Sequence, residues 1–161
     1  MATKKNLTLT IEPEIDFELI AISATTADYK ICMALDEKFD LPFQFSETIE
    51  KKTQNVVAKF SVFSLVCDVR QTEICLINNK SEGNILVNDF RQADFILRLK
   101  GDWALQQKEN LISFLKIING VNAVMKPDAG TLKDVEWLTF ELPDKEYFYH
   151  KQYVEGRKQQ S

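Results

Sequence analysis

The feature that most limits the possible folds is a run of alternating side chains between Val56 and Lys100. Side chains of a strand point to opposite faces of a sheet in turn, so alternation marks a strand. The stretch 94–99 alternates most regularly, and in 56–69 both faces are largely apolar, as in a strand inside a sheet. Polar turn residues separate these stretches. The pattern predicts an antiparallel meander.

Two segments beside the meander have the pattern of helices. Residues 25–28 resemble a capping box, which predicts a helix over 26–38. Asp102 is suited to cap a helix over 103–119, with Gly120 as its end. We therefore predict an α+β fold, an antiparallel β-sheet meander with two main helices packed on one face. The second helix is apolar around so much of its circumference that another element or a second subunit should cover the remainder.

The other segments give shorter patterns. A chain of 161 residues suits one domain, and we assign 1–150 to it and 151–161 to a frayed polar tail. The stretch 15–22 fits either a helix or a strand. Further strands are expected at 7–12, 43–45, 121–125 and 135–142, and loops at 48–54 and 78–84. The aromatic stretch 147–153 is expected to dock on the domain or on a partner.

Charge and hydropathy narrow the classes of partner. The net charge of −4 argues against nucleic acid, because binding to nucleic acid is driven by neutralising phosphates. No apolar run approaches the roughly 20 residues that a membrane-spanning helix needs. The first ten residues lack the apolar core of a secretory signal. We therefore expect a cytoplasmic protein with no membrane partner.

The three cysteines, Cys32, Cys67 and Cys75, lack the spacing of metal ligands. A hairpin turning about Gln71 would place Cys67 opposite Cys75. Two interpretations follow: buried thiols that pack as small hydrophobic groups, or a redox pair.

The sequence offers little for catalysis, and we predict no catalytic residue, cofactor or metal. The single histidine, His150, has no suitably spaced partners and is expected at the surface. Asp94 lies on a predicted strand and is the acid of most interest. It is either a general acid or base with a raised pKa, or a structural carboxylate that accepts backbone N–H groups of the turn 89–92. The structural interpretation is the stronger one.

The stretch 86–95, Leu-Val-Asn-Asp-Phe-Arg-Gln-Ala-Asp-Phe, resembles the signature of the IPExxxVDY family of uncharacterised bacterial proteins. Val87-Asn88-Asp89 stands where that signature has Ile-Pro-Glu, and Ala93-Asp94-Phe95 where it has Val-Asp-Tyr. Residues 16–23 and 28–35 are similar to the family as well. The resemblance implies a structural signature at Asp89, Asp94 and Phe95, and it implies no activity.

Two hypotheses for function follow. The first is a non-enzymatic protein-interaction module that associates with a protein partner or with itself as a homodimer. It rests on the surplus apolar face of the second helix and on the aromatic tail. The second is a small-molecule-binding protein or enzyme with a pocket between sheet and helices near Asp94.

Overall fold

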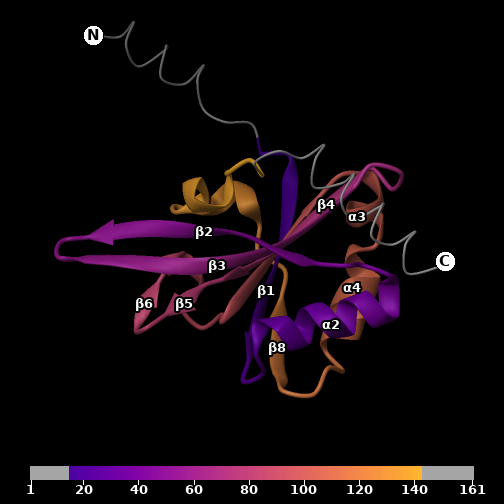
Figure 1. Cartoon of the computed structure of the whole chain (residues 1–161), viewed down its shortest axis with the longest axis horizontal. Helices are drawn as coiled ribbons and strands as arrows, with labels where there is room; N and C mark the ends of the chain where they lie inside the picture. The colour runs from indigo at the N-terminus through magenta and orange to yellow at the C-terminus, as the bar shows by residue number, and fades with distance from the viewer. Residues whose placement is uncertain (1–14, 143–161) are drawn as a thin grey trace, which may run out of the picture.

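Strand β7 (Phe95–Lys100) lies inside a six-stranded antiparallel sheet, between β4 and β1. The computed structural model describes residues 15–142, and Figure 1 shows their arrangement. The sheet order is β2-β3-β4-β7-β1-β8. The other strands are β1 (Phe17–Ala24), β2 (Gln44–Thr53), β3 (Val56–Cys67), β4 (Thr72–Asn78) and β8 (Val121–Met125). The predicted α+β fold with an antiparallel sheet is confirmed. The stretch 15–22, which fitted either a helix or a strand, is a strand from Phe17 onward.

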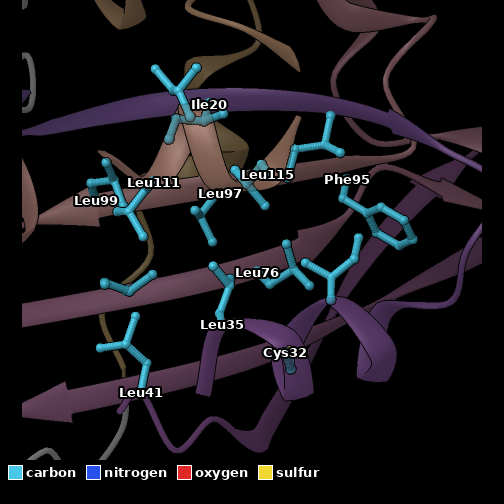
Figure 2. Close-up of a cluster of buried hydrophobic side chains, with 14 of the residues drawn as sticks. Ile20, Cys32, Leu35, Leu41, Leu76, Phe95, Leu97, Leu99, Leu111 and Leu115 are labelled. Atoms are coloured by element: carbon cyan, nitrogen blue, oxygen red, sulfur yellow. The ribbon is translucent and has the colours of Figure 1, made fainter. Parts of the chain in front are cut away.

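Three helices cover one face of the sheet: α2 (Asp28–Phe39), α3 (Asp102–Gln106) and α4 (Lys108–Leu115). Figure 2 shows leucine and isoleucine side chains of strands and helices pointing toward one another in this helix-side core. Alternate residues of β7, namely Phe95, Leu97 and Leu99, point into it. The prediction of helices packed on one face is confirmed.

Both predicted helix starts need correction. No side chain caps α2, because the residue before it is Ala27, which has no acceptor, and Asp28 accepts the N–H of Tyr29. Gly101 precedes α3. The predicted helix 103–119 is interrupted at Gln107, whose ψ of 1° departs from helical geometry, and α4 ends at Leu115. After α4 the N–H groups of Ile117 and Ile118 donate to carbonyls three residues back, as in a 3-10 turn. The carbonyl of Gly120 then accepts the N–H of Thr25.

The apolar face of α4 is covered within the chain. Leu111, Ile112 and Leu115 are buried in the helix-side core, and the ring of Phe114 packs edge-on against Phe39 at 5.5 Å. Ile117, which follows the helix, is 77% exposed. Of the two alternatives, another element of the same chain covers the apolar face of this helix: α2 packs against it, and no second subunit is needed there.

The opposite face of the sheet is covered by residues 129–142, which we call the covering segment. It contains the 3-10 helices η2 (Ala129–Thr131) and η3 (Val135–Leu138), so the predicted strand at 135–142 is wrong. Side chains hold this segment in place of a backbone ladder: Asp89 accepts the N–H of Lys133, and Asp134 accepts the N–H of Asn88. Its apolar residues close the second, covering-side core.

The predicted charged loop at 48–54 is also wrong except at its last residue, because 48–53 lie in β2 and pair with β3, and only Gln54 lies in the turn. Glu50 stands opposite Lys59, and the backbone ladder outweighs the low strand propensity of the charged side chains. β3 pairs with β4 only from Val62 onward. The ends of β2 and β3 therefore project as a two-stranded ribbon, visible at the left of Figure 1.

The predicted loop at 78–84 contains a small hairpin of β5 (Lys80–Ser81) and β6 (Asn84–Ile85), followed by the 3-10 helix η1 (Asn88–Phe90). The predicted strand at 7–12, the aromatic stretch 147–153 and His150 lie outside the described residues.

Candidate functional site

The three residues of the predicted structural signature lie around β7 and have separate partners. Asp94 accepts the N–H of Ala24 at 2.8 Å and forms an ion pair with Lys80 at 3.3 Å. Asp89 accepts the N–H of Lys133, and Phe95 is buried in the helix-side core. Asp94 is thus a carboxylate bonded to backbone, although its donor lies in β1 and not in the turn 89–92. It does not line either of the two clefts described below.

Asn79, which sequence reasoning missed, fixes the loop that leads to these residues. Its buried side chain donates to the carbonyls of Phe90 and Ala93 at 2.9 and 3.0 Å. Its Oδ1 accepts the N–H of Val87 at 2.8 Å. One amide therefore satisfies three buried backbone groups, which identifies a structural role.

The predicted pairing of Cys67 with Cys75 is wrong. Cys67 stands opposite Thr72, and Cys75 stands opposite Ser64, because the hairpin turns earlier than a loop centred on Gln71 would. Burial raises the pKa of the Cys32 and Cys75 thiols to about 12, so both are protonated at neutral pH. These two cysteines pack as small hydrophobic groups and are poor nucleophiles.

The most elaborate polar site is centred on Arg98, which sequence reasoning noted only as one member of an alternating strand. Its side chain is 1% exposed and lies in the covering-side core. Its Nη2 binds Glu73 Oε1 at 2.6 Å, and Nη1 donates to the carbonyls of Leu138 and Phe140 at 2.9 and 2.7 Å. The guanidinium also lies over the Phe140 ring at 4.3 Å. Arg98 therefore fastens the covering segment to the sheet.

Three polar atoms near this ion pair have no hydrogen-bond partner within residues 15–142: Arg98 Nε, Ser64 Oγ and Glu47 Oε1. Ser64, Cys75 and Arg98 occupy one row across three strands. Glu47 lies on β2, opposite Val62. Burial raises the pKa of the Glu47 carboxyl, and the positive charge of Arg98 offsets only part of that rise. The ionised carboxylate of Glu47 is therefore poorly compensated within the described chain.

Glu47 lies on β2, which among residues 15–142 is an edge strand of the sheet, and its outward backbone groups can be identified. The Ser61 carbonyl accepts the Asn78 side chain at 3.1 Å, so it points toward β4. N–H and C=O of one antiparallel residue point to the same side, and the direction alternates along the strand. Thr48, which stands opposite Ser61, therefore presents its N–H and C=O to the open edge, as do Glu50 and Lys52.

Two clefts lie elsewhere on the described surface. One of about 460 Å³ lies beside the start of β1, between Phe17 and the residues 126–130. Its lysines are paired already, Lys108 with Glu18 at 2.6 Å and Lys126 with Glu109 at 3.0 Å. The other, of about 240 Å³, lies at the β3–β4 turn beside Cys67.

Neither a cluster of metal ligands nor a known relative indicates a chemistry for residues 15–142. No group of three or more His, Cys, Asp or Glu side chains in this range is arranged to hold a metal ion. None of its helices is long and apolar enough to cross a bilayer. The chain matches no protein-family model, no curated protein and no solved structure. The resemblance to the IPExxxVDY family stays a prediction.

Proposed function

We propose that this protein is an interaction module that binds an extended segment of a protein partner along the open edge of β2. The observation that carries the proposal is the row of outward N–H and C=O groups at Thr48, Glu50 and Lys52 on a strand of ten residues. Such a row is a template for one more strand. Strand addition needs no active-site chemistry, and the partner's backbone supplies most of the recognition.

The position of β2 supports this role. With β3 it projects beyond β4 as a two-stranded ribbon (Figure 1), and no strand within residues 15–142 pairs with its outer side. Its inner face is braced: Lys51 Nζ donates to the carbonyls of Ile85 and Leu86 at 3.1 and 2.9 Å and lies 5.5 Å from the Trp137 ring centre. A braced strand loses little conformational freedom on binding.

The proposal is tested by photo-crosslinking in the cell of origin. A photo-reactive phenylalanine analogue replaces Lys52 at the edge, and Lys38 on the exposed side of α2 is the matched control position. We expect an adduct with a second polypeptide from position 52 only. The adduct should persist with Glu50→Ala, which keeps the outward N–H, and vanish with Glu50→Pro, which removes it.

Each outcome is informative. Loss of the adduct with proline but not with alanine supports backbone pairing at the edge. An adduct that survives Glu50→Pro, or the absence of any adduct at position 52, contradicts the proposal. Thermal unfolding of both Glu50 variants verifies that the fold is intact, because proline is tolerated where an edge N–H faces solvent.

The cleft beside β1 supports a second candidate, a small-molecule-binding protein, because 460 Å³ falls in the usual range of ligand sites. Phe17 and Ile15 offer apolar contact and Lys108 and Lys126 offer positive charge. The existing ion pairs of both lysines make this site weaker than the β2 edge. Thermal shifts with a metabolite library test it, and Phe17→Ala should abolish any stabilisation that this cleft causes.

A further inference from the structure

We infer that the occupant of the β2 edge is a second copy of this chain, paired antiparallel about a twofold axis at Ile49. This inference rests on the proposed function and deepens it by naming the partner and the register. It follows from the order of side chains along 47–51, Glu-Thr-Ile-Glu-Lys, and from the direction of the backbone groups.

The backbone permits this register. A twofold axis at Ile49 places Thr48 of one copy opposite Glu50 of the other, and the same pair forms again across the axis. Both residues present their N–H and C=O outward, so each pair exchanges two hydrogen bonds. Ile49 meets Ile49 of the second copy, which adds an apolar contact at the centre.

The charges favour the same register. Glu47 of each copy stands opposite Lys51 of the other, at a non-hydrogen-bonded position where Cα atoms approach to about 4.5 Å. Glu47 Oε1 has no hydrogen-bond partner within residues 15–142 but is buried in its own chain, so the carboxylate must turn toward the edge to meet Lys51 of the second copy. Lys51 Nζ donates to the Ile85 and Leu86 carbonyls, which leaves one of its three N–H groups for that contact. Within one chain the two residues are about 13 Å apart along the strand, too far to pair.

Neighbouring registers are less favourable. An axis at Glu50 brings two glutamates face to face, and an axis at Lys51 brings two lysines face to face. Like charges directly opposite each other destabilise a strand pair. An axis at Thr48 places Glu47 opposite Ile49 and leaves the carboxylate without a cation. The axis at Ile49 is the one among these that pairs opposite charges twice.

The test is sedimentation of the full chain together with two charge-reversal variants. In Glu47→Lys, positions 47 and 51 are both lysine, so lysine faces lysine twice across the interface. In Lys51→Glu both positions are glutamate, so glutamate faces glutamate twice. Each variant alone should therefore be a monomer. An equimolar mixture places lysines opposite glutamates and should form a heterodimer. We expect at least a tenfold gain in apparent affinity on mixing, in line with about 1.4 kcal/mol or more per interface.

A second pair of variants covers the risk that reversal near Arg98 disturbs folding. Thr48 is exposed and stands opposite Glu50 of the second copy, so Thr48→Lys should tighten the dimer and Thr48→Glu should weaken it. Equal dimer affinity in these two variants contradicts the register.

The outcomes separate this inference from the proposed function. A wild-type chain that sediments as a monomer at about 100 µM overturns the inference, while a crosslinked adduct with a different protein leaves the proposed function standing. A dimer that is insensitive to Glu50→Pro and to both charge reversals contradicts both.

Discussion

At the scale of single residues, Arg98 is the position with the largest consequences for stability. It is a buried cation in an apolar core, and its hydrogen bonds join β7, β4 and the covering segment. The strand pattern of 94–99 identified its face, but the sequence could not show that another segment covers that face. Its partners lie 25 to 42 residues away in the chain, beyond the reach of local periodicity.

Replacing this cation should be costly. Arg98→Met removes the cation that pairs with the buried Glu73 carboxylate, and it removes the donor to the Leu138 and Phe140 carbonyls. We therefore expect a loss of about 3–5 kcal/mol in the free energy of unfolding. Urea denaturation followed by circular dichroism measures it. Arg98→Met combined with Glu73→Leu should recover part of the loss, because the Glu73 carboxylate is no longer buried without a cation, while the Leu138 and Phe140 carbonyls still lack their donor. A loss below about 1 kcal/mol in the single variant contradicts this role.

Glu47 should make stability depend on pH in a defined direction. Burial raises the folded-state pKa of this carboxyl above the ordinary 4.5, so folding favours its protonated form and its ionisation opposes folding. Glu47→Gln should therefore stabilise the chain at neutral pH, and this gain should fade as pH falls through the folded pKa toward 4.5. Urea unfolding between pH 4 and 8 in a Glu50→Pro background, where association does not contribute, measures the difference. A constant difference across that range contradicts the assignment.

At the scale of elements, the sequence predicted those whose periodicity is strong. The stretch 94–99 and the helix near 26–38 were found because a single packed face dictates their pattern. The strand predicted at 43–45 marks only the start of β2, because the rest of this edge strand has charged side chains on its exposed face and resembles a loop. The strand predicted at 135–142 was wrong because the side chains of Asp89 in η1 and Arg98 in β7, which no local pattern reveals, hold that segment.

The loop before β7 should depend on Asn79. Asn79→Ala leaves two carbonyls and one N–H without their side-chain partners, so we expect a loss of about 3 kcal/mol in the free energy of unfolding and faster hydrogen exchange at Val87. Asn84→Ala is the matched control, because that side chain makes only a 3.4 Å bond to Glu82. Equal losses in the two variants contradict a special role for Asn79.

The junction between β7 and α3 should require glycine. Gly101 has φ of 99°, and an added Cβ would lie 2.0 Å from the Gln71 carbonyl oxygen. Gly101→Ala must therefore displace backbone, and we expect a loss above about 3 kcal/mol. Gly83 has φ of 82° in open surroundings, so Gly83→Ala should cost only about 1 kcal/mol. Thermal unfolding compares the two, and a smaller loss at Gly101 contradicts the contact.

At the scale of the whole molecule, the central strands of the sheet are covered on both faces within the chain, and the outer edge of β2 is the surface proposed for association. The sequence predicted association from the apolar face of α4, but α2 covers that face. Association through β2 depends on the direction of its backbone groups and the order of its charges, which a loop predicted at 48–54 does not reveal.

Sedimentation equilibrium of the complete wild-type chain tests the central claim most directly. The chain has a mass of 18.6 kDa, and the account predicts twice that mass at tens of micromolar, with a return to the single-chain mass in Glu50→Pro. A mass of 18.6 kDa for the wild-type chain at about 100 µM, or a dimer that Glu50→Pro leaves unchanged, would contradict the claim.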